Sequence, residues 1–103
     1  MDSGFSLREP YCVYFTASQK NGTLYVGVTN NIAARAFDHR EGRGSAFTKA
    51  YNVTRLVYME LFDDVNEAIA REKELKKWRR EWKIDLIESA NPDWDDLFLK
   101  LNH

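Results

Sequence analysis

The chain has one cysteine, two prolines and five glycines in 103 residues, and these scarcities exclude several classes of protein. With Cys12 alone, neither an internal disulfide nor a cysteine-rich zinc site can form. No apolar run reaches the roughly 18–20 residues that span a bilayer. The first ten residues, MDSGFSLREP, lack a basic segment followed by an apolar one, so we expect no secretory signal. These absences predict a cytoplasmic protein that has no membrane partner.

A strong overall charge is also missing, because the formal net charge is −1 and the sequence pI is about 6.1. The charges are nevertheless placed unevenly. Residues 71–83 hold seven basic and three acidic side chains, whereas residues 85–103 hold five acidic side chains and one lysine. The basic segment is either a surface for nucleic acid or a solvated helix face. Within it, Trp78 and Trp82 can pack in a core or stack on bases.

Hydrophobic periodicity predicts an α+β fold with a small three-stranded antiparallel sheet flanked by helices, in one domain over residues 1–103. β-branched and aromatic runs predict strands at 11–16, 23–28 and 54–62. One helix is expected at 31–41, capped by Thr29 or Asn30, and residues 45–51 form a connector. A second helix is expected at 65–77 after Asp64, with continuation toward 89. A last short helix is expected to start at Asn91-Pro92.

The first two strands are predicted to form a hairpin. Asn21-Gly22 is a strong signal for a two-residue turn. With that turn, one face of the hairpin is apolar, and Tyr14, Tyr25 and Gly27 share the opposite, more polar face. Gly27 removes a side chain from that face and weakens its strand, which raises the question of what approaches the bare backbone there.

Glu72 lies on the apolar stripe of the helix predicted at 65–77. An ionised carboxylate on a buried stripe is costly unless it is paired or bound to a metal. It can form a buried salt bridge, for instance to Arg35, or sit at a boundary where it reaches water. It can also be the ligand of a hard divalent cation such as Mg²⁺, which takes one or two protein carboxylates and keeps several waters.

Arg35 and His39 lie one turn apart on the helix predicted at 31–41. Arg35 is either a surface arginine or a bidentate phosphate ligand, a role for which the planar guanidinium is suited. His39 alone can shuttle a proton, hold a phosphate oxygen or do neither. Tyr14 and Tyr25 taken singly are ordinary strand aromatics, and a phenol with a pKa of about 10 needs a nearby cation to act as a base.

These residues in this order resemble the GIY-YIG nuclease superfamily, in particular its small single-domain bacterial members. The resemblance covers a core of about residues 10–98. It rests on Cys12-Val13-Tyr14, Tyr25-Val26-Gly27, Arg35, His39 and the segment EAIAREKELKKW at 67–78. The first tripeptide keeps the tyrosine of the family motif, but Cys12 replaces its glycine, a change that affects the backbone more than the chemistry.

The resemblance implies a metal-dependent endonuclease that hydrolyses phosphodiester bonds in DNA or another nucleic acid. Tyr14 would act as the general base or together with it, and Tyr25 would help to position the water or the phosphate. Arg35 would stabilise charge on the scissile phosphate, and Glu72 would hold a single Mg²⁺ or Mn²⁺ ion. His39 would transfer a proton or contact the phosphate.

Four further positions complete the expected site. Gly27 would let the phosphate backbone approach, while Lys49, Lys76 and Arg79 would contact the nucleic acid. The alternative is a non-catalytic module that keeps the fold and binds nucleic acid or protein. The near-neutral charge favours weak binding or a protein partner that supplies substrate specificity.

Overall fold

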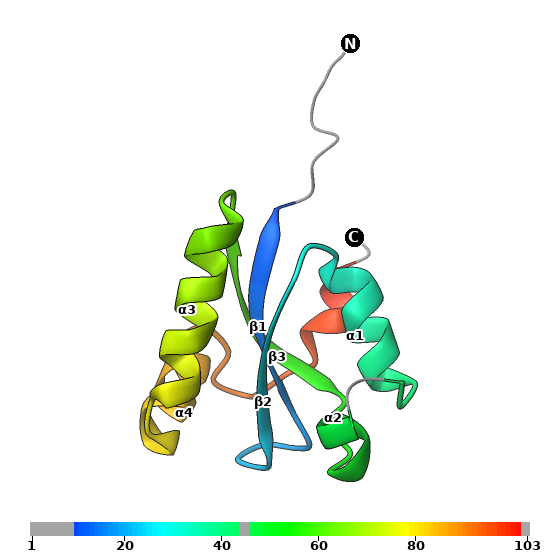
Figure 1. Cartoon of the computed structure of the whole chain (residues 1–103). Helices are drawn as coiled ribbons and strands as arrows, with labels where there is room; N and C mark the ends of the chain where they lie inside the picture. Colours follow the sequence, from blue (N-terminus) through cyan, green and yellow to red (C-terminus); the bar gives the residue numbers. More distant parts are fainter. Residues whose placement is uncertain (1–9, 44–45, 102–103) are drawn as a thin grey trace.

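A three-stranded antiparallel sheet forms the centre of the computed structural model, which describes residues 10–43 and 46–101 (Figure 1). β1 (Tyr11–Ala17) is the middle strand, β2 (Leu24–Thr29) pairs with one of its sides and β3 (Arg55–Phe62) with the other. The predicted α+β architecture is confirmed. Among the described helices, none is long and apolar enough to cross a membrane.

The register between β1 and β2 differs from the predicted one by two residues. Tyr14 lies opposite Gly27, and Thr16 lies opposite Tyr25. Because a shift of two residues keeps every side chain on its face, the predicted faces of the hairpin are correct although the pairing is wrong. The shift brings Tyr25 to the nearest diagonal position from Tyr14.

The hairpin turn explains the shift. The Gly22 amide donates to the Gln19 carbonyl at 2.9 Å, so the turn is centred on Lys20 and Asn21 and not on Asn21-Gly22. Asn21 has a φ of 59°, a left-handed conformation that asparagine tolerates well. The Ser18 hydroxyl accepts a hydrogen bond from the Thr23 amide at 2.9 Å and stabilises this longer connection.

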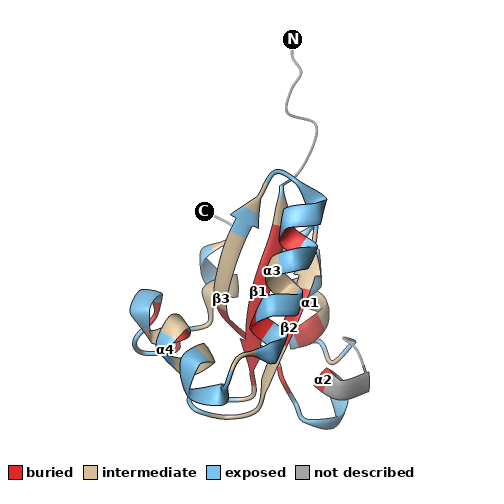
Figure 2. Cartoon of the chain, turned by 60° about the vertical axis from the view of Figure 1, so that its left-hand side comes forward, coloured by how far each residue is buried: buried red, intermediate tan, exposed pale blue. Residues whose placement is uncertain are grey.

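Different helices cover the two faces of the sheet (Figures 1 and 2). α3 (Val65–Lys77) and α4 (Arg80–Ala90) contribute Ala68, Leu75 and Ile87 to the core over the apolar face. On the other face, α1 (Ile32–Arg40) packs with the 3₁₀ helix η2 (Leu97–Lys100), and α2 (Ala46–Ala50) lies beside α1. The sheet therefore separates α1 from α3, and the edge strand β2 lies between them in Figure 1.

The predicted starts of α1 and of the C-terminal helix are wrong, whereas α3 has the predicted bounds 65–77. α1 is capped by Asn31, whose Oδ1 accepts from the Ala34 amide, and not by Thr29 or Asn30. The helix after Asp64 ends at Lys77, because Trp78 and Arg79 take extended conformations with ψ of 151° and 153°. Extended residues interrupt a helix as effectively as glycine or proline, and local composition does not reveal them.

The C-terminal helix also begins later than predicted. Asp96 caps η2 by accepting from the Phe98 amide, so no helix starts at Asn91-Pro92. Asn91 is buried, and its side-chain amide donates to the Val57 and Asp95 carbonyls at 2.9 Å each. The asparagine thus ties the tail to β3, because satisfying its buried amide requires both carbonyls.

Candidate active site

Tyr14 fills the space beside Gly27. A Cβ added at Gly27 would lie 2.6 Å from Tyr14 Cζ and closer still to the hydroxyl oxygen, which no real side chain tolerates. Tyr14 is 1% exposed, because its ring lies across the bare backbone of the neighbouring strand. The prediction that Gly27 leaves the backbone open to a phosphate is therefore wrong: the glycine makes room for the tyrosine.

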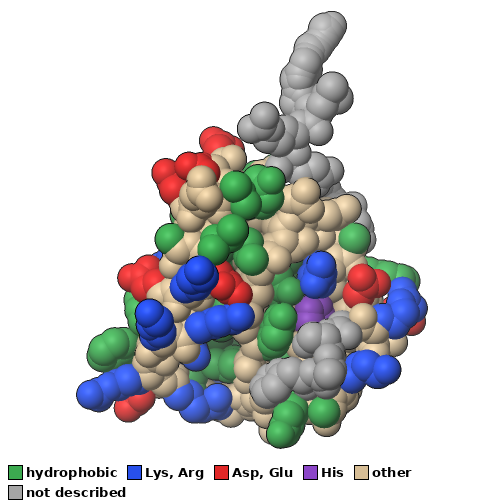
Figure 3. Space-filling view, viewed as in Figure 1, with side chains coloured by type: hydrophobic (Ala, Val, Ile, Leu, Met, Phe, Trp, Pro, Cys, Tyr) green, Lys and Arg blue, Asp and Glu red, His purple; other side chains and the backbone are tan. Residues whose placement is uncertain are grey.

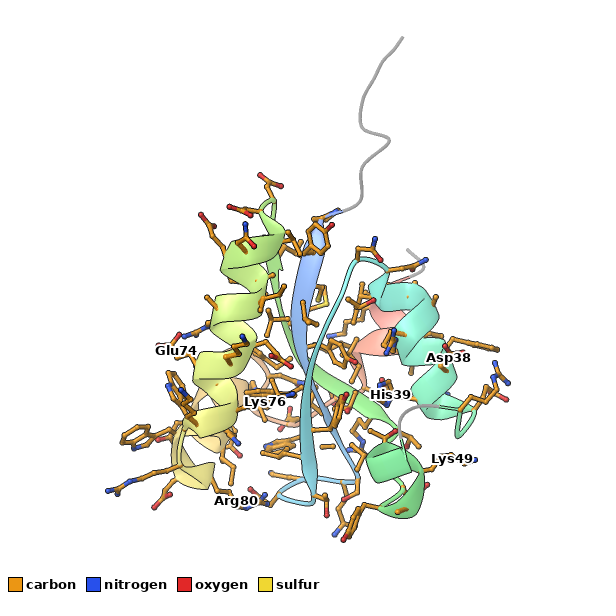
Figure 4. All side chains as sticks on the ribbon, viewed as in Figure 1. Asp38, His39, Lys49, Glu74, Lys76 and Arg80 are labelled. Carbon is orange, nitrogen blue, oxygen red and sulfur yellow. The ribbon has the colours of Figure 1, made fainter. Side chains whose placement is uncertain are left out.

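Three rings meet on this face of the sheet. The centroid of the Tyr14 ring lies 6.3 Å from that of Tyr25 and 5.8 Å from that of His39, and the Tyr25 and His39 centroids are 5.6 Å apart. The Tyr14 hydroxyl is 3.4 Å from His39 Nε2, at the long end of hydrogen-bond range. His39 comes from α1 and is 2% exposed (Figure 4).

Burial keeps the Tyr14–His39 pair neutral. It raises the pKa of Tyr14 well above its ordinary value of 10, as does neighbouring Tyr25, although the Arg35 guanidinium partly opposes the shift. Burial is also the main cause that lowers the pKa of His39, and Arg35 lowers it further. A neutral phenol therefore faces a neutral imidazole, and in the tautomer with its proton on Nδ1 the Nε2 atom accepts from the Tyr14 hydroxyl.

The other ring nitrogen of His39 has no hydrogen-bond partner among the described residues. The nearby Val53 carbonyl raises the pKa of His39 and favours a proton on Nδ1. Nevertheless, Nδ1 forms no hydrogen bond with any residue in the described part of the chain. A buried donor without a partner costs free energy, so the position of His39 is not explained by its own hydrogen bonding alone.

Burial of His39 makes the protein sensitive to mild acid. Its pKa is below 6.5 in the folded state, so the unfolded chain binds the proton more readily. We expect the free energy of unfolding to decrease as the pH falls below about 6.5, by at most about 1.4 kcal/mol per pH unit for one proton. Urea titrations between pH 7.5 and 5 measure this slope, and His39→Gln should flatten it. An equally steep slope in that variant would assign the proton uptake to another group.

Arg35 lies beside the ring cluster and is exposed on α1. Its guanidinium interacts with the Tyr14 hydroxyl and lowers the pKa of that group, and its positive charge also lowers the pKa of His39. Arg43 pairs with Asp38 and Arg40 with Asp96, whereas no carboxylate in the described ranges pairs with Arg35. A guanidinium that no described carboxylate neutralises can bind an anionic ligand.

Glu72 lies on the other side of β2 from α1 and its His39. It lies on α3, its side chain is 14% exposed, and its carboxylate accepts from Lys76 Nζ at 2.7 Å. Lys76 extends from α3 toward β2, while His39 lies across that strand on α1 (Figure 4). The salt bridge suggested between Glu72 and Arg35 is therefore not formed, since Lys76 is the partner.

The remaining predicted contacts are dispersed. Lys49 is exposed on α2, at a distance from α3 (Figure 4). Arg79 is exposed between α3 and α4. Only Lys76 lies next to a residue of the predicted site. The structure thus gathers Tyr14, Tyr25, Arg35 and His39 without Lys49 or Arg79.

Thr16 is a further residue of this face of the sheet, and it was not predicted from the sequence. It is fully buried on the same face as Tyr14, opposite Tyr25, and its hydroxyl has no hydrogen-bond partner among the described residues. Thr48 is also buried, at 3% exposed. The signal for Thr16 was its alternation with Tyr14 along the strand, but threonine is too common in strands to stand out.

The residues present fit one kind of metal site. Across the described ranges, no three His, Cys, Asp or Glu side chains gather closely enough to hold an ion together. Mg²⁺ can bind one protein carboxylate and take its other ligands from water and substrate phosphates. Glu72 is such a carboxylate, partly buried and already facing a cation. It fits Mg²⁺ or Mn²⁺ that binds together with a phosphate.

Comparison with known proteins gives consistent matches. The family model described as the GIY-YIG catalytic domain matches residues 10–85. The UPF0213 protein SSP2268 of Staphylococcus saprophyticus is 41% identical over 68 residues, which are 66% of this chain and 83% of that protein. The UPF0213 protein SH2523 of Staphylococcus haemolyticus is 41% identical over 69 residues, 67% and 84% of the two chains.

A solved structure has the same fold. The solution NMR structure of the UPF0213 protein BH0048 from Bacillus halodurans superposes with a TM-score of 0.53 at 28% sequence identity. The similarity covers 84% of this chain and 92% of that one. The sheet and helices of this chain are therefore arranged like those of a small protein whose structure has been solved.

Proposed function

Since the chain belongs to the GIY-YIG catalytic domain family, a nuclease family, we propose that it is an endonuclease that hydrolyses phosphodiester bonds in DNA. The observation that carries the proposal is the cluster of Tyr14, Tyr25 and His39 with the Arg35 guanidinium, free of any described carboxylate, beside it. Cleavage needs an activated water, compensation of charge on the phosphate and a proton for the leaving oxygen.

Arg35 supplies the charge compensation. Its planar guanidinium can donate two parallel hydrogen bonds to phosphate oxygens, and it stays protonated throughout the reaction. It projects from α1 next to the Tyr14 hydroxyl, so a phosphate bound to Arg35 lies beside the hydroxyl. Tyr25, from β2, then orients the attacking water or the phosphate.

Tyr14 and His39 together take the proton from water. Tyr14 is a neutral phenol at rest, because burial raises its pKa, and cannot act alone as a ready-made base. It can receive a proton from water while its own proton passes to His39 Nε2, 3.4 Å away. The water oxygen then bonds to phosphorus, the bond from phosphorus to the leaving oxygen breaks, and the leaving oxygen takes a proton from solvent water. His39 holds the added proton and releases it to solvent after the step.

Glu72 would hold the divalent cation, Mg²⁺ or Mn²⁺. When bound, such an ion supplies positive charge to phosphate oxygens and stabilises the leaving oxygen. A site with this single carboxylate depends on the substrate for further ligands, so metal and nucleic acid should bind cooperatively.

Incubating the protein with labelled single-stranded, duplex and branched DNA, and with RNA, tests the proposal. We expect cleavage only when Mg²⁺ or Mn²⁺ is present, and we expect it to disappear in Glu72→Ala. Cleavage that survives in Glu72→Ala and Arg35→Ala alike would come from a contaminant or another site. Binding without cleavage by the parent protein would favour the non-catalytic module, to which the buried, neutral Tyr14 gives some weight.

Lys76 should compete with the metal for Glu72. Its ammonium is 2.7 Å from the carboxylate, but it is half exposed, so the pair contributes at most about 1 kcal/mol. We expect Lys76→Met to tighten Mn²⁺ binding by about two- to fivefold, as measured by electron paramagnetic resonance in the absence of nucleic acid. The control is Lys77→Met, which removes the neighbouring charge and leaves the pair intact. Weaker binding in Lys76→Met would refute competition.

A further inference from the structure

The junction of α3 and α4 gathers cations from both helices. Because Trp78 and Arg79 are extended, α4 does not continue the axis of α3 and starts anew at Arg80. We call the exposed or half-buried cations at this junction the basic corner: Lys77, Arg79, Arg80 and Lys83. Lys and Arg side chains gather over α3 and α4 on the lower left of the molecule (Figure 3).

No ion pair within the described ranges neutralises the basic corner. The ion pairs among described residues use Arg40, Arg43, Arg71 and Lys76 and none of the corner cations. Glu81, an acid in the first turn of α4, also forms none of these pairs. Arg80 donates to the carbonyls of Asn21 and Gly22, at 2.6 and 2.7 Å, which are neutral acceptors. The corner is therefore positive in a chain whose net charge is −1.

An exposed aromatic ring lies within the corner. Trp82 is 50% exposed, and the Arg79 guanidinium carbon lies 5.3 Å from the centre of its ring. Trp78 packs against the core and meets Trp82 edge to face, at 6.1 Å between centroids. Trp78 thus anchors Trp82, which leaves half of a large ring in water beside unpaired cations, an arrangement suited to stacking on a nucleic-acid base.

The corner adjoins the candidate active site. Arg80 donates hydrogen bonds to the hairpin turn. This turn leads directly into β2, the strand that carries Tyr25 and Gly27. Lys76, in the last turn of α3, extends toward β2 and contacts Glu72 (Figure 4). A strand bound at the site can therefore pass Lys76 and reach the corner without crossing the molecule.

We propose that Trp82 and the basic corner bind an unpaired strand of nucleic acid, with a base on Trp82 and phosphates on the cations. In a duplex the faces of the bases are stacked on one another and cannot reach Trp82, so the corner selects single-stranded segments. This inference rests on the proposed function only in placing the single-stranded segment next to the cleaved bond.

Binding in EDTA tests the corner without cleavage. The probes are a fluorescein-labelled single-stranded DNA of mixed sequence, the same sequence as a duplex, and its RNA counterpart. We expect the parent protein to prefer the single strands to the duplex, and Trp82→Ala to weaken single-strand binding by about tenfold. Trp82→Phe should retain most of the affinity, and the control Leu99→Ala, which truncates another exposed apolar side chain, should retain all of it.

Tryptophan fluorescence gives a second readout that does not depend on a truncated variant. Single-stranded DNA should quench the emission of the parent protein but not that of Trp82→Phe. Equal affinity for duplex and single strand, or unchanged binding and quenching after removal of Trp82 from a folded protein, would overturn the inference. Trp82-dependent binding without any cleavage would leave it standing and refute the proposed function instead.

Discussion

Replacing Arg35 with alanine is expected to lower kcat for phosphodiester cleavage by about 10²- to 10³-fold, the usual cost of removing one group that stabilises developing charge. The reason is that Arg35 is the exposed guanidinium beside the Tyr14 hydroxyl and has no carboxylate partner among the described residues. Single-turnover rates on a labelled oligonucleotide, at saturating protein, separate this loss from a loss of binding.

Two variants sharpen the test. Arg35→Lys keeps the charge and loses the paired hydrogen bonds, so its kcat should lie between that of the parent protein and that of Arg35→Ala. Arg43→Ala removes an arginine just beyond α1 whose charge is already paired with Asp38 at 3.5 Å, and it should leave kcat within about twofold. If Arg35→Ala and Arg43→Ala behaved alike, Arg35 would have no special role in the reaction.

Replacing Gly27 with alanine should disrupt the site from within. The new Cβ would lie 2.6 Å from Tyr14 Cζ, so the tyrosine must move or the two strands must separate. We expect the free energy of unfolding to decrease by about 1–3 kcal/mol, as in other overpacked cores. We also expect cleavage to be lost, because the Tyr14–His39 hydrogen bond is broken. Urea titration and the same single-turnover assay measure the two effects.

A double-mutant cycle identifies the cause. Tyr14→Ala removes the atoms that clash, so in that background Gly27→Ala should cost much less stability. Gly42→Ala is the comparison: its φ of +75° strains any side chain, but no atom lies within 4 Å of the added Cβ. Its cost should not depend on Tyr14. Additive effects of Gly27→Ala and Tyr14→Ala would show that the glycine serves another purpose.

The sequence predicted the architecture because the relevant signals are local. Alternation assigned both faces of the hairpin, and this survived an error in the turn, since a shift of two residues preserves the faces. Asp64 correctly predicted the start of α3, because its side chain caps the helix. The bounds of α3 were predicted, but the break that separates it from α4 was not, because Trp78 and Arg79 adopt extended conformations that their own preferences do not require.

The candidate residues came from the resemblance, but their relationships came from three-dimensional packing. Arg35 and His39 are one turn apart in any helix, whereas the approach of Tyr14 to both depends on the exact pairing of β1 with β2. The salt bridge to Arg35, one of the alternatives for Glu72, is not formed, because a nearer cation takes its place. Lys76, four residues away on the same helix, reaches the carboxylate without any tertiary rearrangement.

The packing of Tyr14 on Gly27 has a consequence for how such sequences can diverge. A change at Gly27 to any larger residue is harmful while the tyrosine is present, and a change at Tyr14 leaves bare backbone exposed while the glycine remains. Substitutions at the two positions are therefore epistatic, and the order in which they arise matters. A lineage that lost the tyrosine could later acquire a side chain at position 27, and return to the ancestral site would then require two reversions.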